Sequence, residues 1–430
     1  MAAGRLSRWF LLLAAALAMV LRAPIYVTGP SFWAEEGTLY FAVAWGHSLR
    51  EAVSYRQAGY LSLWPKLATL VAARLARSGV LPLVHAPQVT VLFALAVQLL
   101  PVAVIAWSGA PFWGGPIRRA VGILIVLVGV LTDEIWLNTV NSQPWLVLTA
   151  ALLLLEPAAS GRARGWAASG VLALAGLTAP VTSVLLPLFA WRAWRSRARP
   201  AVAQVGVLAV CAVVQAWCMW TAVRSGESLP PRAGGIALGV FAATVWMRTL
   251  ILPLFGVAMT TEFGDLIKQS HGIGPVVALL LLALAGGLIG WLARGLRAGE
   301  RGALVGAYVL VTTLNLLTAI GDKAILLHSP WASSRYVFAS GVLVLLMLLG
   351  CVRGGAGVLR PTVCALLLGL ALVRGVTGYS GSVRWKPSWP VWTEQVQAWE
   401  ADPRRPLQIW PPPWTLSLPP PAVETGGRGR

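Results

Sequence analysis

Long runs of apolar residues alternate along the chain with short segments rich in arginine. A helix of about 20 apolar residues is long enough to cross the hydrocarbon core of a bilayer. The runs lie at residues 9–21, 83–107, 120–137, 144–155, 166–177, 181–191, 201–223, 275–293, 303–320, 336–351 and 356–373. The pattern predicts an all-α, polytopic integral membrane bundle with about eleven transmembrane helices.

Two neighbouring runs, at residues 166–177 and 181–191, are too short to be ordinary spans. They are separated by Thr178-Ala179-Pro180, and a proline ends a helix because it has no backbone N–H to donate. We expect a tight helical hairpin that breaks there. The first run follows Arg5 and Arg8, and we expect it to be a retained span rather than a cleaved signal peptide, because the chain that follows is polytopic.

The composition supports a membrane protein. Hydrophobic residues make up 57% of the chain and charged residues 11%, whereas a soluble protein carries about 25% charged residues. The chain cannot cover a water-facing globule of its size, and the same figures exclude a disordered protein, a coiled coil and a secreted disulfide scaffold. The 22 tryptophans suit long membrane–water borders.

The net charge of +19 arises from 34 basic and 15 acidic residues. Basic residues concentrate in loops that face the cytoplasm, and the eleven runs place fifteen basic and two acidic residues (Glu156 and Glu300) on the N-terminal side of the membrane. This predicts a cytoplasmic N-terminus and an external C-terminus. It also requires that residues 60–75 and 236–259, interrupted by Lys66 and Arg248, lie along the outer interface as amphipathic helices.

Two parts of the chain follow from this topology. Residues 1–374 form the transmembrane domain, which includes a large first outer loop (residues 22–82) with interfacial helices. Residues 375–430 form an outer tail rich in tryptophan and proline, which we expect to pack as a small cap. The protein is predicted to be a multi-pass protein of the plasma or inner membrane.

The first outer loop contains adjacent carboxylates, Glu35 and Glu36, followed by Tyr40. Two neighbouring carboxylates raise each other's pKa, and partial burial adds to that shift, so one of them could serve as a general base. The alternative is a pair of solvated carboxylates at the interface.

A second acidic pair, Asp133-Glu134, is followed by Asn141 and Gln143 at the outer end of two runs. Polar groups at the border of hydrocarbon need partners, so this segment is either a hydrogen-bonded turn or a second wall of the same site that binds sugar hydroxyls. The pair could hold a divalent metal, but it lacks defined ligand spacing. No metal site is predicted, because the histidines are scattered and no CxxC spacing is present.

A third group lies before the run at 336–351 and contains Lys323, His328, Arg335 and Tyr336. Cations at the outer end of a span are contrary to the topological bias. They either reach toward lipid headgroups or form a clamp for an anionic phosphate, to which arginine offers a bidentate fork.

These features together resemble the membrane-embedded C-type glycosyltransferase superfamily. The superfamily includes protein O-mannosyltransferases, aminoarabinose transferases and actinobacterial arabinosyl- and mannosyltransferases, and the composition favours an actinobacterial member. The resemblance rests on Glu35-Glu36 with Tyr40, on the broken hairpin at Ala175–Pro180, and on Ser334-Arg335-Tyr336 opening a late helix. The family commonly has Asp-Glu where this chain has Glu35-Glu36.

The resemblance implies a sugar donor linked to polyprenyl phosphate and an acceptor in the cell envelope: a glycan, a lipid or a protein. Glu35 or Glu36 would be the general base, and one displacement would invert the anomeric centre. Asp133, Glu134, Asn141, Gln143, Tyr40 and Tyr336 would line the site, while Lys323, His328 and Arg335 would bind the phosphate. No cofactor is implied with certainty, a divalent metal stays open, and no nucleic-acid partner is expected. The alternative is a non-enzymatic membrane protein of similar fold, such as a lipid-carrier flippase, an export channel or a scaffold.

Overall fold

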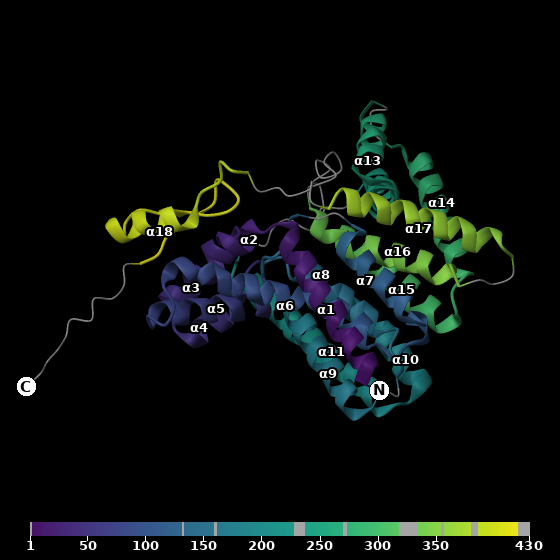
Figure 1. The fold of residues 1–430 in the computed structure, drawn as a ribbon, viewed down its shortest axis with the longest axis horizontal. Helices are drawn as coiled ribbons and strands as arrows, with labels where there is room; N and C mark the ends of the chain where they lie inside the picture. Colours follow the sequence, from purple (N-terminus) through teal and green to yellow (C-terminus); the bar gives the residue numbers. More distant parts are fainter. Residues whose placement is uncertain are drawn as a thin grey trace, which may run out of the picture.

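The computed structural model describes residues 2–130, 133–158, 161–227, 237–269, 273–317, 333–353, 357–379 and 386–419. Within these ranges the chain is almost wholly helical (Figure 1). The α-helices are α1 (Ala2–Arg22), α2 (Ile25–Thr28), α3 (Ala42–Gly46), α4 (Leu49–Ser54), α5 (Leu63–Arg77), α6 (Ala86–Trp107), α7 (Pro116–Val128), α8 (Gln143–Leu153), α9 (Arg162–Thr178), α10 (Leu186–Ser196), α11 (Arg199–Arg224), α12 (Leu238–Thr244), α13 (Leu252–Gln269), α14 (Pro275–Ala293), α15 (Ala298–Asn315), α16 (Phe338–Cys351), α17 (Leu359–Thr377) and α18 (Trp392–Ala401).

Short elements complete the description. Two π-helical segments, η1 (Glu36–Phe41) and η5 (Val245–Ile251), lead into α3 and α13. The 3-10 segments are η2 (Leu83–His85), η3 (Pro111–Trp113), η4 (Pro180–Leu185) and η8 (Ser334–Tyr336). Strands β1 (Leu407–Gln408) and β2 (Thr415–Leu416) form an antiparallel pair in which Leu407 faces Leu416.

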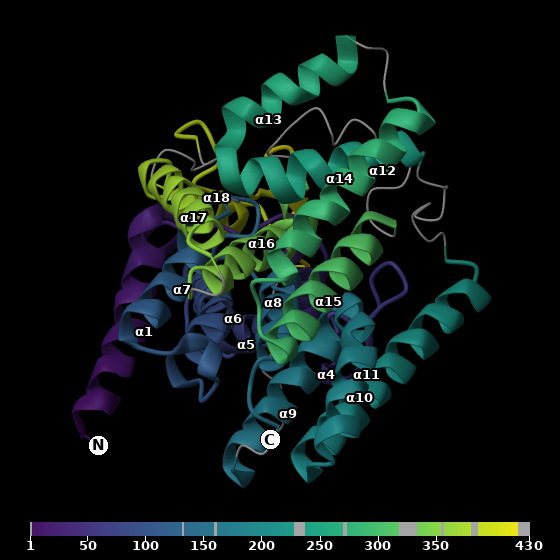
Figure 2. The same ribbon diagram turned by 90° about the vertical axis from the view of Figure 1, so that its right-hand side faces the viewer.

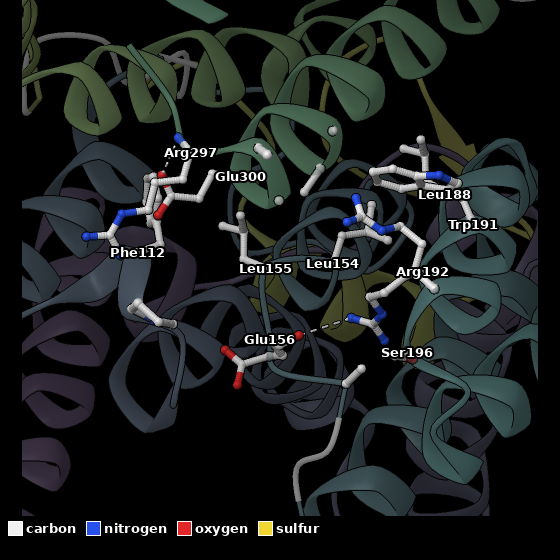
Figure 3. Close-up of a pocket in the computed structure, with 17 residues that line it drawn as sticks. Phe112, Leu154, Leu155, Glu156, Leu188, Trp191, Arg192, Ser196, Arg297 and Glu300 are labelled. Carbon is white, nitrogen blue, oxygen red and sulfur yellow. Dashed lines mark hydrogen bonds between the residues drawn. The ribbon is translucent and has the colours of Figure 1, made fainter. Parts of the chain in front are cut away.

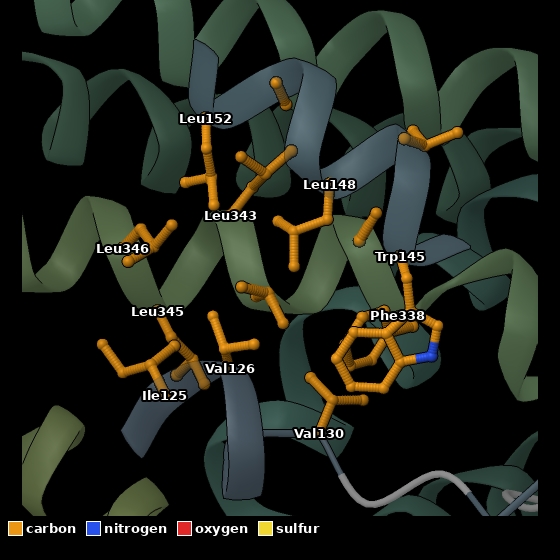
Figure 4. Packing of buried hydrophobic residues seen from close by; sticks show 14 of the residues in the cluster. Ile125, Val126, Val130, Trp145, Leu148, Leu152, Phe338, Leu343, Leu345 and Leu346 are labelled. Atoms are coloured by element: carbon orange, nitrogen blue, oxygen red, sulfur yellow. The ribbon is translucent and has the colours of Figure 1, made fainter. Parts of the chain in front are cut away.

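Helix α16 is the centre of the bundle. All of its 14 residues are buried, and a helix that is apolar on every side belongs in a protein interior. Figure 4 shows it packed between α7 and α8 through the side chains of Ile125, Val126, Val130, Trp145, Leu148, Leu152, Phe338, Leu343, Leu345 and Leu346. At 1.5 Å per residue α16 is about 21 Å long. Because all of its residues are buried, the neighbouring helices shield it from lipid.

Five helical stretches are long and apolar enough to cross a membrane: Leu83–Trp107, Arg199–Arg224, Leu238–Gln269, Pro275–Ala293 and Leu359–Thr377. Three of them, at α11, α14 and α17, expose apolar side chains such as Val213, Leu279, Leu284 and Leu366. These surfaces have no favourable place in water. The chain is therefore a helical membrane protein with several spans, while the count of eleven remains a prediction.

The loops predicted to be cytoplasmic meet at one end of the bundle. Glu156 accepts a hydrogen bond from Ser108, Arg118 donates to the carbonyl of Leu349, and Arg353 pairs with Glu300. Loops from the other ends of the same helices meet far from these, where Arg22 pairs with Asp133 and Asn315 donates to the carbonyl of Tyr336. These arginine-containing segments thus lie at one end of the bundle, and the cytoplasmic orientation of that end remains a prediction.

The stretch Leu238–Gln269 differs from the other candidate spans in its contacts. Its backbone is broken at Gly256, where φ is 80°. Gly239 lies against Ile273 just before α14, Arg248 reaches Ser334 just before α16, and Gly256 lies beside Arg374 in the last turn of α17. The stretch therefore runs across the ends of three helices (Figure 2). Its length alone fits a span, and the interfacial placement predicted for residues 236–259 remains a prediction.

The predicted break in the helical hairpin is present. Helix α9 ends at Thr178, and Pro180 begins the 3-10 segment η4 that leads into α10. Helix α11 packs along both α9 and α10. Arg192 on α10 donates a 2.5 Å hydrogen bond to the carbonyl of Leu153, at the end of α8, so the chain returns to the end of the bundle from which α9 began.

The tryptophan-rich tail shares a hydrophobic core with the first outer loop. Buried members of this second core include Trp392, Trp399, Ile409 and Leu416 from the tail, and Phe32, Phe41 and Leu70 from the loop. Figure 1 shows α18 beside α2 to α5 at one end of the molecule, away from the N-terminus. The tail and the first outer loop therefore pack together around one shared hydrophobic core.

Candidate functional site

The most densely bonded carboxylate is Glu36, at the start of η1. It is 2% exposed. Its side chain accepts hydrogen bonds from the backbone N–H of Thr139 (2.8 Å) and from the hydroxyls of Thr139 and Thr90, the latter at 3.2 Å. The backbone N–H of Trp33 adds a fourth donor at 3.3 Å. Glu36 therefore ties the first outer loop to α6 and to the loop between α7 and α8.

The protonation of Glu36 reflects two opposing effects. Burial raises the pKa of its carboxyl group, while the hydrogen bonds from Thr139, Trp33 and Thr90 lower it, and the net direction is upward. A raised pKa alone would suit a general base. However, all four donors occupy the carboxylate and solvent does not reach it, so Glu36 holds the loop in place and has no free face for an acceptor.

Glu35 is in a different environment although it is the adjacent residue. It is partly exposed and follows Ala34, whose φ of 43° turns the backbone sharply. The charge of Glu35 acts on both Arg335 and Tyr40. Tyr40 is buried, and burial is the main reason that the pKa of its hydroxyl is raised. Of the two adjacent carboxylates, Glu35 is the accessible one.

Arg335 lies in η8 and faces the loop between α7 and α8. One guanidinium nitrogen, Nη1, is 3.1 Å from Oε1 of Glu134 and 3.4 Å from Oδ1 of Asn141. The side chain of Arg335 is 35% exposed, whereas that of Glu134 is 16% exposed. Burial lowers the pKa of Arg335, but Tyr336, Glu134 and Glu35 together raise it above its usual value. The guanidinium thus stays charged and remains partly accessible.

A second cation, Arg248, lies beside this pair. It is 3% exposed, and its Nη2 is 3.5 Å from Oγ of Ser334. The charge of Glu134 acts on it. Arg248 belongs to the π-helical segment η5, just as Glu36 belongs to η1, and single π-helical turns occur frequently at functional sites. We call Glu35, Glu36, Glu134, Arg248 and Arg335 the Glu–Arg cluster.

The sequence contained a signal for Arg248 that we interpreted differently. An arginine in an apolar stretch is costly unless it faces the protein interior. The hydropathy pattern predicts only that Arg248 interrupts an amphipathic helix at the outer interface, and that placement remains a prediction. In the structure the helix that carries it covers the end of α16, so the side chain points into the protein and approaches Ser334 from a direction that the local pattern does not reveal.

The loop between α7 and α8 is held by its own amides. Asn138 and Asn141 donate to the carbonyl oxygen of Glu134 at 2.9 and 2.8 Å, and Oδ1 of Asn138 accepts from the backbone N–H of Asn141 at 3.0 Å. Gln143 donates to the hydroxyl of Tyr60 at 3.3 Å. The segment is thus a hydrogen-bonded turn, and its binding of sugar hydroxyls remains a prediction.

Asp133 has a separate role. Its carboxylate accepts a 2.7 Å hydrogen bond from Arg22, and both side chains are at most 4% exposed. The guanidinium of Arg22 also stacks over Trp136 at 4.1 Å. Asp133 thus pairs with α1 rather than with Arg335, and we leave it out of the Glu–Arg cluster.

The remaining predicted residues are placed as follows. Tyr336 lies under the guanidinium of Arg335, with its ring centre 5.0 Å away. Lys323 and His328 lie outside the described residues. Among the residues that are described, no group of three His, Cys, Asp or Glu side chains could hold a metal ion.

Comparisons with known proteins identify no family for this chain. No family model, no curated protein and no solved structure matches the chain.

Proposed function

We propose that this chain is a membrane glycosyltransferase that moves a sugar from polyprenyl phosphate to an acceptor hydroxyl at the outer face of the plasma or inner membrane. The observation that carries the proposal is the Glu–Arg cluster, in which Glu134 pairs with Arg335 at 3.1 Å and its charge acts on Arg248, while the charge of the partly exposed Glu35 acts on Arg335. The resemblance to the C-type superfamily and the eleven-span topology with a cytoplasmic N-terminus are parts of the same proposal.

Glu35 is the general base in this proposal. It takes the proton of the acceptor hydroxyl while the oxygen attacks the anomeric carbon and the bond from that carbon to the phosphate oxygen breaks. The leaving group is the polyprenyl phosphate, which needs no strong acid. Glu36, with its four donors, keeps Glu35 in position. This choice follows from access, because Glu35 is partly exposed and Glu36 is not.

Arg335 binds the phosphate of the donor. Its guanidinium offers several donors in a planar fork, and it is held by Glu134 and Asn141, with Arg248 behind it. A phosphate that enters the cluster would compete with Glu134 for Arg335. Stabilisation of the charge on the leaving phosphate by a fixed cation contributes about 10²–10³-fold in rate.

The test is sugar transfer by the full-length protein in nanodiscs supplied with polyprenyl-phosphate-linked mannose or arabinose. We expect Glu35→Gln to lower the rate by about 10²–10⁴-fold without lowering the melting temperature. Arg335→Gln should lower it by a similar factor. The matched control is Glu262→Gln, which removes an exposed carboxylate from α13 and should leave the rate unchanged.

Transfer at the wild-type rate by Glu35→Gln would contradict the assignment of the base. Absence of transfer by the folded wild-type protein with both donors would favour the non-enzymatic alternative, a flippase, export or scaffold protein.

A further inference from the structure

A cavity of about 520 Å³ lies at the opposite end of the bundle from the Glu–Arg cluster. Helix α8 begins with Gln143 beside the cluster and ends with Leu153 beside the cavity, about 16 Å away along the helix axis. The volume is in the range of sites for small molecules and lipid headgroups. We call this cavity the arginine pocket.

The arginine pocket has two kinds of lining. Figure 3 shows apolar side chains distributed across it, with Phe112 on one side, Leu154 and Leu155 in the middle, and Leu188 and Trp191 on the other side. The charged part is lined by Arg192, Arg195, Arg297, Glu156 and Glu300. An apolar wall next to charged groups fits an amphiphile better than it fits a small soluble ion.

The two glutamates of the pocket already have partners. Glu156 accepts hydrogen bonds from the hydroxyl of Ser108 and from the backbone N–H of Gly109. Glu300 forms an ion pair with Arg353, which does not line the pocket. The donors to Glu156 are uncharged, and its charge acts on Arg192. Among the residues that the structure describes, neither glutamate forms an ion pair with Arg195 or Arg297.

Arg195 and Arg297 are the accessible cations. Both are exposed, and within the described part of the chain neither forms an ion pair with a carboxylate. Three arginines and two glutamates line the pocket, so its lining carries an excess of positive charge. An anion in the pocket would offset this charge.

Exposed tryptophans at the edge of the pocket indicate a membrane–water interface. Trp191 is 40% exposed and Trp194 on the same helix is 71% exposed. Indole rings concentrate at the level of lipid headgroups. The guanidinium of Arg195 stacks over the ring of Trp191 at 5.1 Å, so a cation and an apolar surface are presented together.

We propose that the arginine pocket binds the phosphate group of an anionic membrane lipid, with Arg195 and Arg297 at the phosphate and the Leu188–Trp191 wall along the lipid chain. The lipid belongs to the leaflet on the arginine-rich side of the bundle. Guanidinium groups bind phosphate through paired hydrogen bonds. This proposal concerns the end of the bundle opposite the Glu–Arg cluster and does not depend on sugar transfer.

The test compares the melting temperature of the full-length protein in nanodiscs of phosphatidylcholine with that in nanodiscs containing phosphatidylglycerol. We expect phosphatidylglycerol to raise the melting temperature by about 3–5 °C. The variant Arg195→Gln/Arg297→Gln should lose this shift. The matched control Arg197→Gln/Arg294→Gln removes the same charge from exposed arginines at the same end and should keep it.

Three results would overturn the proposal. One is no shift with phosphatidylglycerol, and another is an equal loss in both double variants, which would mean nonspecific attraction to surface charge. The third is an equal shift from inorganic phosphate added to phosphatidylcholine nanodiscs, which would mean that a soluble anion fills the pocket. Native mass spectrometry provides a second readout, the number of phosphatidylglycerol molecules retained by each variant.

Discussion

Charged side chains cluster at both ends of α8 and α16, but the two groups differ in how far they are buried. At one end, Glu36 and Arg248 are almost fully buried, and Glu36 accepts four hydrogen bonds. At the other end, Arg195 and Arg297 are exposed beside a cavity of about 520 Å³. The comparison teaches that burial, rather than residue type, separates a charged group that fixes the fold from one that is free to bind a ligand.

The difference arises because one end is covered. Trp410 of the tail donates its backbone N–H to the carbonyl of Phe32 at 3.0 Å, and its own carbonyl accepts from the N–H of Ala34 at 2.5 Å. This short bridge fixes the segment that leads directly into Glu35. No described element covers the arginine pocket in the same way.

The largest loss of stability should come from removing the side chain of Trp410, which lies in the tail that packs on the first outer loop. Trp410 is 1% exposed, so Trp410→Ala should lower the free energy of unfolding by about 4 kcal/mol, because a large buried aromatic side chain leaves a cavity. Denaturation followed by circular dichroism measures the loss. The control Trp414→Ala changes a tryptophan of the same hairpin that is 38% exposed. An equal loss in both variants would contradict burial of the Trp410 side chain as the cause.

The next effect separates the two adjacent glutamates. Glu36→Ala should lower the free energy of unfolding by about 3 kcal/mol, because buried donors from Thr139 and Thr90 lose their acceptor. Glu35→Ala should cost less than about 1 kcal/mol, because Glu35 is partly exposed and no buried donor in the described part of the chain depends on it. Comparable losses would show that burial does not distinguish the two carboxylates.

A smaller effect depends on pH and concerns Lys66 on α5. Burial lowers the pKa of Lys66 from 10.5 to about 8. Between these values the unfolded chain binds a proton that the folded chain does not, so stability should rise with pH by about 2 kcal/mol across the window. Melting curves from pH 8 to about pH 10 measure this slope.

Lys66→Met should flatten the slope, whereas Lys268→Met, at a site whose side chain is 42% exposed, should not. An unchanged slope in Lys66→Met would mean that another group titrates in this window.

The smallest effect is expected at the arginine pocket. In phosphatidylcholine nanodiscs, Arg195→Gln and Arg297→Gln should each change the free energy of unfolding by less than about 0.5 kcal/mol, because both side chains are exposed. A loss as large as that for Glu36→Ala would show that these arginines stabilise the fold, and the contrast between the two ends would fail.

The sequence was informative where a local pattern decides the structure. The apolar runs predicted candidate spans such as Pro275–Ala293, and Pro180 predicted the end of α9. Both features are local, because hydropathy and the missing backbone N–H of proline affect the segment in which they occur. The common placement of residues near 35 and near 335 at the outer ends of predicted spans predicts that they share one site. The charge of Glu35 acts on Arg335, and a shared site remains a prediction.

The sequence did not predict hydrogen bonds and ion pairs between residues that are far apart along the chain. Nothing near Glu36 indicates that Thr90 and Thr139 donate to it, and nothing near Asp133 indicates Arg22, which is 111 positions away. Arg248 was misread for the same reason, since only the position of its helix over α16 explains its burial. The arginine pocket also escaped prediction, because its arginines read as ordinary topology signals.

The most direct test of the central claim is an electron cryo-microscopy map of the full-length protein with polyprenyl phosphate bound. The account predicts phosphate density within hydrogen-bonding distance of Arg335, on the side that Glu35 can reach. A map of the folded, lipid-bound protein with no phosphate at Arg335, or with Glu35 separated from it by packed side chains, would contradict the account.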